Sequence, residues 1–376
     1  MPQAFKSIRD AKDLKGKRVL LRLDLNVPVI GDEVRDDFRI RRSLPTVEFL
    51  KKAGAKTIVI SHIENDLTDS LSRVATYIAK TVEIKAFVAK FEDAKTVVDN
   101  MREGDVIVME NLRKHPGEKE NDPVFAGRLA SLADIYVNDA FAVSHRDHAS
   151  IVSLPRLLPS YAGLLLSEEV EGLSAAFNPP RPFLFIIGGI KFDTKLPLIE
   201  KFLDIADYVF VGGALANDIY KEKGYETGRS VVAPSRINLK HVEMSPKLIV
   251  PSDVVVASAI ETAVRSPDQI GLDEKVVDAG PRTISEISDL LSDVKFVVWN
   301  GPLGDYPKGF AEGTESLALA LIESGVKTVL GGGDTIAVVS KLNLLDRFSF
   351  VSTGGGAMIE FLAKGTLTGI EALKQQ

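Results

Sequence analysis

The segment FSFVSTGGGAMIEF, residues 348–361, begins as an alternating strand, breaks at three glycines and continues with helical spacing. A second segment, KTVLGGGDTIAVV at residues 327–339, has the same order of strand, glycine triplet and helix. Strands that alternate with helices are typical of βαβ units and parallel sheets. The two segments therefore predict an α/β chain in which strands run into glycine at one edge of a sheet.

Glycine follows five apolar runs in the second half of the chain: PFLFIIGGIK, DYVFVGGALAN, KFVVWNGPLG, KTVLGGGDT and FSFVSTGGGA. Parallel sheets bind ligands at the carboxyl ends of their strands, and the exposed amides at the start of a helix favour anions. A tight turn is the structural alternative for any one glycine. Because so many occur together, we predict a phosphate site built from backbone amides. Asp334, directly after one triplet, is either a helix cap or a magnesium ligand.

The strands of the first half end in polar and cationic residues instead: Asp24 and Asn26, His62, Asn111 and Arg113, and His145 and Arg146. Guanidinium groups match the geometry of carboxylates and phosphates. These endings favour a small anion held by arginines. The sequence therefore predicts two sites of different chemistry, one in each half.

Composition sets limits on the class of protein. With 376 residues, of which 45% are hydrophobic and 26% charged, the chain is long for one domain and we expect two. The net charge of −6 argues against a nucleic-acid or membrane-surface binder. Cysteine is absent, which excludes disulfides, and no signal peptide or membrane span is apparent. We expect a cytoplasmic protein.

Several common motifs are missing from the sequence. It contains no G-x-x-x-x-G-K-[ST] phosphate loop, no G-x-G-x-x-G after a strand, and neither H-E-x-x-H nor G-x-S-x-G. A Walker-type phosphate loop is therefore excluded, and a zinc protease, an α/β-hydrolase and a doubly wound dehydrogenase keep little support. Phosphoryl transfer between two anions remains.

The chain resembles phosphoglycerate kinase in motifs that follow the family's order: RLDLNVP, DDFRIRRSLPT, MENLRKHP, YVNDAFAVSHRDHAS, IIGGIKFDTKLPLI, VVWNGPLG, LGGGDT and VSTGGGA. The resemblance implies an α/β protein with two doubly wound parallel-sheet domains joined by a helix, with a cleft between them. Residues 1–162 would bind 3-phosphoglycerate, 163–180 would form the interdomain helix and linker, 181–362 would bind nucleotide, and the tail 363–376 would return to the N-terminal domain. Hinge closure would bring the substrates together.

The resemblance also assigns residues to each substrate. The 3-phosphoglycerate site would use Asp24, Asn26, Arg39, His62, Arg113 and Arg146. The nucleotide site would use Lys191, Lys195, Gly212, Gly213, Asn300, Gly332, Gly333, Asp334 and Thr335, with Asp334 as the ligand of Mg²⁺. Arg39, Lys191, Gly354 and Gly355 would contact the transferred group.

The implied reaction is reversible phosphoryl transfer between ATP and the carboxylate of 3-phosphoglycerate, a glycolytic and gluconeogenic step that yields ADP and 1,3-bisphosphoglycerate. Mg²⁺ would accompany ATP or ADP. We expect a monomer that binds neither nucleic acid nor membranes.

The sequence departs from the family pattern at three places. Ile63, Glu64, Asn65 and Asp66 replace the usual Gly-Arg-Pro after His62, Pro307 stands near the position of the usual ribose-binding glutamate, and Ala142 replaces a glycine. Two alternatives therefore stay open: a binding or regulatory homologue with little catalysis, and a kinase that acts on a related acid.

Overall fold

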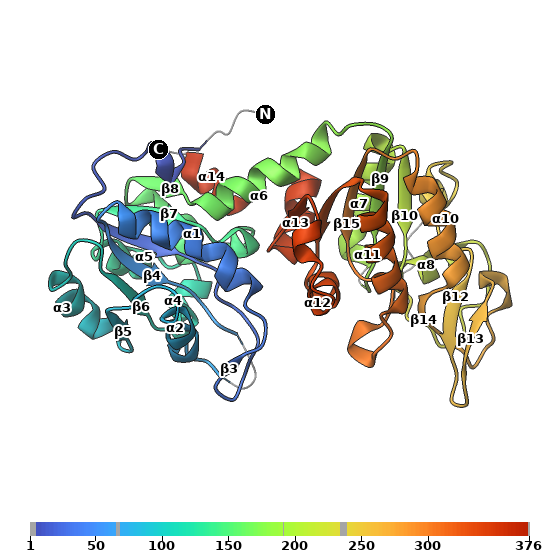
Figure 1. Cartoon of the computed structure of the whole chain (residues 1–376), viewed down its shortest axis with the longest axis horizontal. Coiled ribbons are helices and arrows are strands. Elements are labelled where there is room, and N and C mark those ends of the chain that lie inside the picture. Colours follow the sequence, from blue (N-terminus) through green and yellow to red (C-terminus); the bar gives the residue numbers. More distant parts are fainter. Residues whose placement is uncertain (1–4, 65–67, 191, 234–238, 375–376) are drawn as a thin grey trace. The chain divides into compact units, whose positions relative to one another are not determined.

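The computed structural model describes residues 5–64, 68–190, 192–233 and 239–374, and the chain divides into two compact units. Unit 1 contains the residues up to Glu171 and those from Lys364 onward, and unit 2 spans Gly172–Ala363. The division falls within helix α6 (Leu164–Ser174), drawn in green in Figure 1. Each unit is built on a six-stranded parallel sheet, which confirms the α/β fold with parallel-sheet domains.

The sheet of unit 1 has the strand order β5-β6-β4-β1-β7-β8, and all its pairs are parallel. Its strands are β1 Arg18–Arg22, β4 Lys56–Ile60, β5 Ala86–Val88, β6 Val106–Met109, β7 Ile135–Asn138 and β8 Ser160–Ala162. From β1 the connections lead first to one side of the sheet and then to the other, which is the doubly wound order. A short antiparallel hairpin, β2 (Val29–Ile30) with β3 (Glu33–Val34), precedes the first long helix.

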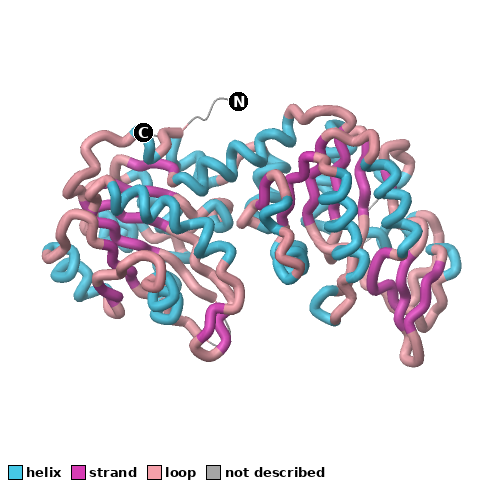
Figure 2. Tube along the Cα trace, in the orientation of Figure 1, coloured by secondary structure: helices cyan, strands magenta, loops and turns pink. Residues whose placement is uncertain are grey.

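Helices cover both faces of this sheet, as the cyan and magenta tube of Figure 2 shows. They are α1 Phe38–Lys52, α2 Ser72–Ile78, α3 Ala94–Asp99, α4 Pro116–Lys119 and α5 Pro123–Ala130. Alternate strand residues face opposite sides. Val19 and Leu21 of β1 pack in one core cluster with Ile40 and Val47 of α1, while Leu20 is buried on the other face. Burial on both sides explains why these strands read as continuous apolar runs.

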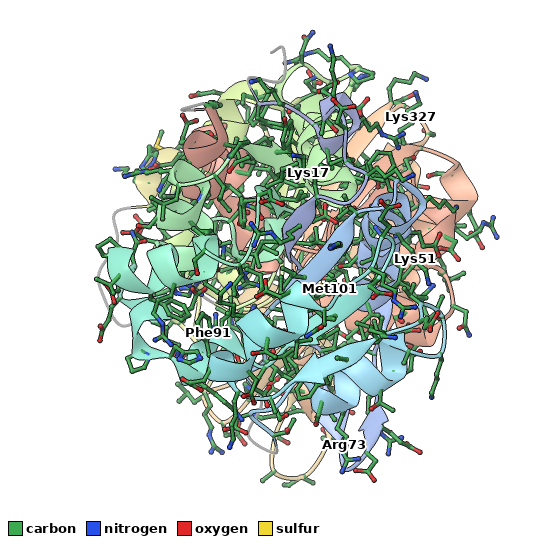
Figure 3. The ribbon with its side chains drawn as sticks, turned by 90° about the vertical axis from the view of Figure 1, so that its left-hand side faces the viewer. Lys17, Lys51, Arg73, Phe91, Met101 and Lys327 are labelled. Atoms are coloured by element: carbon green, nitrogen blue, oxygen red, sulfur yellow. The ribbon has the colours of Figure 1, made fainter. Side chains whose placement is uncertain are left out.

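Two residues labelled in Figure 3, Lys51 and Phe91, illustrate local contacts in unit 1. Lys51 stands in the last turn of α1, where positive charge interacts favourably with the helix dipole. The ring of Phe91 lies edge-on to His115, with 5.5 Å between centroids, and His115 stacks on Phe125 at 5.1 Å. These rings pack segments that precede α3 and α4 against α5.

The last described helix, α14 (Thr368–Lys374), packs on the turn Ala149–Ser153 of unit 1. The amide of Gly369 donates a hydrogen bond of 2.8 Å to the carbonyl of Ser144. A Cβ at position 369 would stand 2.8 Å from Cγ2 of Ile151, so only glycine permits this approach without a shift. The helix therefore supports the loop that carries Arg146.

Asp139 is fully buried where β7 ends and α6 begins. Its Oδ1 accepts a hydrogen bond of 3.1 Å from the amide of Leu166, one of the donors left free in the first turn of α6. Its Oδ2 is buried without a hydrogen-bond partner among the described residues. Burial raises the pKa of Asp139 to about 7, so the folded chain favours the protonated form.

The sheet of unit 2 has the order β11-β10-β9-β15-β16-β17 and is also parallel throughout. Its strands are β9 Phe183–Ile187, β10 Tyr208–Val211, β11 Leu248–Ile249, β15 Phe296–Asn300, β16 Lys327–Gly331 and β17 Phe350–Val351. Its helices are α7 Phe192–Ile205, α8 Leu215–Glu222, α9 Lys240–Glu243, α10 Pro281–Leu291, α11 Glu312–Ser324, α12 Gly333–Lys341 and α13 Gly355–Lys364. Local sequence marks several ends: Pro281 opens α10, and Gly325 closes α11 at φ +67°.

Unit 2 also contains a small antiparallel sheet that the sequence pattern did not indicate. Its order is β13-β12-β14, with β12 at Val254–Ala257, β13 at Thr262–Arg265 and β14 at Lys275–Ala279.

Within the described ranges no helix is both long and apolar enough to cross a membrane.

Gly369→Ala should lower the free energy of unfolding by ~1–3 kcal/mol, because the added methyl group overpacks the contact with Ile151. Gly127→Ala in α5 is the matched control, since a Cβ there meets nothing within 4 Å. Alanine favours a helix interior by ~0.5–1 kcal/mol, so the control should be neutral or stabilising. Urea unfolding followed by circular dichroism measures both, and equal effects in the two variants would contradict this packing.

Asp139→Asn should become more stable relative to the wild type as pH rises from ~5 to ~8. An aspartate in the unfolded chain loses its proton near pH ~4, whereas Asp139 in the folded chain loses it near 7. The contribution of Asp139 to the free energy of unfolding is therefore complete below pH ~4 and is lost as pH rises through the folded pKa. The measurement is urea unfolding of both proteins at the two pH values. A stability difference that does not change with pH would exclude the raised pKa.

Candidate active site

The carboxyl ends of the unit 2 strands share one edge of the sheet, and a pocket of about 390 Å³ lies there. The pocket is lined by several residues expected at the nucleotide, Lys195, Gly213, Asn300, Gly332, Gly333 and Asp334, and by Gly355, which was expected at the transferred group. Gly212, Thr335 and Gly354 adjoin lining residues in the chain without being among the described residues that line it. Lys191 lies outside the described residues.

Several of these glycines allow the backbones of neighbouring loops to touch. A Cβ at Gly188 would stand 2.2 Å from the carbonyl oxygen of Pro302, and one at Gly213 would stand 2.6 Å from the amide nitrogen of Gly189. Gly301 has φ +97°, and a Cβ there would meet the carbonyl oxygen of Gly188 at 2.3 Å. No other residue fits these positions without displacing backbone. At Gly188, Gly213 and Gly301, glycine is therefore required by close packing of the backbone and not by a bound phosphate.

Gly333 differs, because a Cβ at this position would meet nothing within 4 Å although the residue lines the pocket. It opens α12, and the preceding Gly332 has φ +103°. The first turn of a helix leaves amide donors without helical partners, and they attract anions. The hydroxyl of Thr335 in the same turn is buried without a hydrogen-bond partner in the described part of the chain. This turn therefore offers donors to a bound phosphate.

Lys195 of α7 is a buried cation that lines the pocket. Its side chain is buried, and its ammonium group donates a hydrogen bond to the carbonyl of Gly188. Burial lowers the pKa of Lys195 to about 8, against the opposing effect of the Asp334 carboxylate. The cation is therefore desolvated in advance, which strengthens its attraction for a phosphate.

Asp334 is the carboxylate of this pocket expected to bind magnesium. It is exposed at the start of α12 and lines the pocket beside the free amides. The described residues contain no group of three or more His, Cys, Asp or Glu side chains that could hold a metal ion by themselves. Mg²⁺ commonly takes one or two carboxylates and completes its shell with phosphate oxygens and water. Asp334 fits magnesium that arrives with a nucleotide.

The pocket also has an apolar lining that was not foreseen from the sequence. It includes Val231, Val276, Val277 and Leu303. Lys275, Asp305 and Pro307 line the pocket too, and the ammonium of Lys275 lies 2.7 Å from Oδ2 of Asp305. Val276 and Lys275 come from strand β14 of the antiparallel sheet, so no local motif marks them. Small-molecule sites are typically lined by apolar side chains with a few polar groups, and this pocket has both.

In unit 1 the strand ends bring together most of the residues expected to bind the acid. Arg39, the second residue of α1, donates a hydrogen bond of 2.9 Å to the carbonyl of Asn26 and lies 3.5 Å from Oδ2 of Asp24. The amide of Asn26 in turn donates to Oδ1 of Asp24 at 3.0 Å. Burial of Asp24 favours its neutral form, but the charge of Arg39 and the hydrogen bond from Asn26, with other nearby groups, outweigh burial and hold the pKa of this carboxyl below its usual value. An ionised Asp24 therefore orients Arg39.

His62 follows β4 and is buried, with 1% of its surface exposed. Arg22 lies 3.2 Å from its Nδ1, and because a guanidinium can only donate, this nitrogen accepts. The proton of the neutral ring is therefore on Nε2, which lies 4.0 Å from Oδ1 of Asp24. Burial lowers the pKa of His62 well below its usual value, although Asp24 opposes this. The ring is a neutral hydrogen-bond donor on the Asp24 side.

Arg22 belongs to a buried polar network that the sequence did not reveal. Its Nε donates to the hydroxyl of Ser150 at 2.9 Å, and that hydroxyl donates to Oε1 of Glu118 at 2.6 Å. Arg22 and Glu118 are both completely buried, with 3.9 Å between their charged atoms. A buried charge is stable only when it is paired and hydrogen-bonded. The network fixes the guanidinium that sets the tautomer of His62.

Arg113 and Arg146, the remaining residues expected to bind the substrate, form with Lys119 a cationic cluster around the carboxylate of Glu64. Arg113 is largely buried, and burial lowers its pKa against the effect of Glu64. Glu64 makes an ion pair with Arg113 and lies 2.9 Å from the ammonium of Lys119. The hydrogen bond from Lys119 holds the pKa of Glu64 below its usual value, and the charges of Arg113 and Arg146 act in the same direction. Lys119 was not among the expected residues.

The departures from the family pattern are thus only partly visible. Glu64 lies on the cationic cluster and Pro307 lines the pocket, whereas Asn65 and Asp66 lie outside the described residues. Ala142 is buried in the short turn Phe141–Val143.

Comparisons with known proteins agree with this arrangement. The model of the phosphoglycerate kinase family matches residues 8–365. The phosphoglycerate kinase of Dictyoglomus turgidum is 38% identical over 396 residues, which cover 99% of this chain and all of that protein. The phosphoglycerate kinase of Orientia tsutsugamushi is 40% identical over 388 residues, with 96% of each chain covered.

Solved structures lead to the same family. The phosphoglycerate kinase of Coxiella burnetii superposes with a TM-score of 0.84 at 35% identity, and 99% of each chain is covered. The enzyme of Pyrococcus horikoshii superposes with a TM-score of 0.85 at 28% identity over 98% of each chain. The two-unit architecture, both strand-end sites and the match along nearly the whole sequence have one explanation: this chain belongs to the phosphoglycerate kinase family.

Proposed function

We propose that the chain transfers a phosphoryl group reversibly between ATP and the carboxylate of 3-phosphoglycerate, giving ADP and 1,3-bisphosphoglycerate. The observation that carries this proposal is the family match along residues 8–365, which spans both strand-end sites. A binding protein without catalysis has no need of both a cation-rich acid site and a phosphate site.

The acid is proposed to bind to unit 1 through Asp24, Asn26, Arg39, His62, Arg113 and Arg146. The neutral His62 ring donates from Nε2, and the arginines pair with the carboxylate and the phosphate of the acid. Charge-assisted hydrogen bonds of this kind are short and directional. Asp24 binds no anion itself and acts by orienting Arg39.

The nucleotide is proposed to bind to unit 2, with its base against the apolar lining of the pocket and its phosphates at the glycines. The residues assigned to it are Lys191, Lys195, Gly212, Gly213, Asn300, Gly332, Gly333, Asp334 and Thr335. Asp334 would hold Mg²⁺ together with phosphate oxygens, and the ion would neutralise part of the phosphate charge. The amides of the first turn of α12 and Lys195 supply the remaining positive potential.

The chemistry needs little from the protein beyond position and charge. A carboxylate titrates near pH ~4, so the nucleophile is ionised at neutral pH and no general base is required. The barrier lies in bringing two polyanions together and in stabilising charge on the phosphoryl oxygens. We assign that stabilisation to Arg39, Lys191, Gly354 and Gly355.

The working context is also a proposal. We propose a monomer in the cytoplasm with small anions, rather than nucleic acid or membranes, as partners. The cysteine-free composition supports the cytoplasm, and the net charge of −6 argues against nucleic-acid or membrane-surface binding.

Arg39→Ala should lower kcat by ~10³-fold or more, by analogy with other arginines that stabilise a transferred phosphoryl group. Arg41→Ala is the matched control, because Arg41 lies on the same helix and pairs with Asp37 at a surface site. The assay is ADP formation from MgATP with and without 3-phosphoglycerate.

Two results of that assay would change the assignment. If the wild type binds ADP without turnover that depends on 3-phosphoglycerate, the chain is a binding homologue. If Arg39→Ala and Arg41→Ala lose activity equally, Arg39 has no special role in transfer.

The affinity for ADP should weaken as pH rises from ~7 to ~9, because a Lys195 with a pKa of about 8 loses its charge in that interval. The terminal phosphate of the nucleotide, with a second pKa near ~6, stays ionised throughout. Lys195→Met should bind ADP more weakly at pH ~7 and show a flatter pH dependence. Calorimetric titration measures both proteins, and parallel pH profiles would exclude Lys195 as the titrating group.

A further inference from the structure

We propose that Glu64 and Lys119 set the affinity of the unit 1 site for the phosphate of its substrate. Lys119 is a further cation for that phosphate, and Glu64 is an internal competitor that occupies the same position. This inference rests on the proposed function and concerns its acid-binding site.

Glu64 engages that site through both its backbone and its side chain. Its amide donates a hydrogen bond of 3.0 Å to Oδ1 of Asn26. Its carboxylate bridges two cations from different segments, since Oε2 pairs with Arg113 and Oε1 lies 2.9 Å from Nζ of Lys119. One residue therefore engages Asn26 and Arg113, both expected to bind the acid.

The position of the Glu64 carboxylate suits an anion for an electrostatic reason. Only 11% of the Arg113 side chain is exposed, and burial of its guanidinium disfavours the charged form unless an anion is near. Nε of Arg113 is buried without a hydrogen-bond partner among the described residues. A phosphate brings more acceptor oxygens and more charge than a carboxylate, so it can satisfy this guanidinium and Lys119 together.

The Glu64 contact is also easily exchanged. The Glu64 side chain is 59% exposed and that of Lys119 is 52% exposed. An exposed ion pair such as Glu64–Lys119 contributes little, so we expect a doubly charged phosphate to displace the carboxylate at a cost of roughly two- to fivefold in affinity. Glu64 is ionised at neutral pH because the hydrogen bond from Lys119 keeps its pKa low. The competition is therefore present throughout the neutral range.

The test is the KM for 3-phosphoglycerate at saturating MgATP in four proteins: wild type, Glu64→Gln, Lys119→Met and the double variant. Glu64→Gln should lower KM roughly two- to fivefold with little change in kcat, and Lys119→Met should raise KM by a similar factor. In the double variant the two effects should not multiply, because both act on one anion position.

Glu120→Gln is the matched control. It removes the same charge one residue beyond Lys119 and should leave KM within error of the wild type. If it lowers KM as much as Glu64→Gln does, the effect is general electrostatics and the competitor role is wrong. An unchanged or higher KM in Glu64→Gln, or a fall in kcat alone, overturns the proposal as well.

Titration with inorganic phosphate keeps this inference separate from the proposed function. If the wild type shows no turnover with 3-phosphoglycerate, the proposed function fails, but the anion position can still be measured by calorimetry. Tighter phosphate binding in Glu64→Gln and weaker binding in Lys119→Met support the position, and equal binding in all proteins overturns it.

Discussion

Three loops of unit 2 meet backbone to backbone at Gly188, Gly213 and Gly301, and the pocket at that edge depends on their contact. A side chain at any of these positions would force backbone to shift, because its Cβ would stand 2.2–2.6 Å from carbonyl or amide atoms. The carbonyl of Gly188 also holds the ammonium of Lys195. The same contact therefore shapes the pocket and positions its buried cation. Parallel strands make it possible, since they bring all these loops to one edge.

Unit 1 solves the problem of binding an anion with the same fold but with side chains. Its strand ends carry a buried carboxylate, a neutral histidine and arginines, and each is oriented by another charged group. The buried pair of Arg22 and Glu118 is expensive in desolvation, and Ser150 and His62 supply the hydrogen bonds that offset it. One unit offers fixed dipoles and the other offers fixed charges. The difference follows from which residues end the strands.

Much of this arrangement could be predicted because it depends on local order. A strand that runs into glycine and then a helix specifies both the parallel sheet and the free amides, as at Gly333. The polar residues of unit 1 could be anticipated for the same reason, since Arg39 stands in the first turn of α1 and His62 lies two residues after β4. What could not be predicted depends on distant segments: the apolar lining that includes Val276 of the antiparallel sheet, and the meeting of Glu64 with Lys119. No spacing in the sequence encodes either.

Unit 1 is discontinuous along the chain, because α14 belongs to it. In the sequence, the whole of unit 2 lies between the N-terminal part of unit 1 and this last described helix. During synthesis the N-terminal domain usually folds first, as it leaves the ribosome. Here the loop that carries Arg146 must wait for Gly369, which is made almost two hundred residues after the division at Glu171. The last residues of the phosphate pocket, Gly355 and Ile359, are also made late, shortly before Gly369. The substrate loop therefore gains its support from α14 only after the whole of unit 2 has been made.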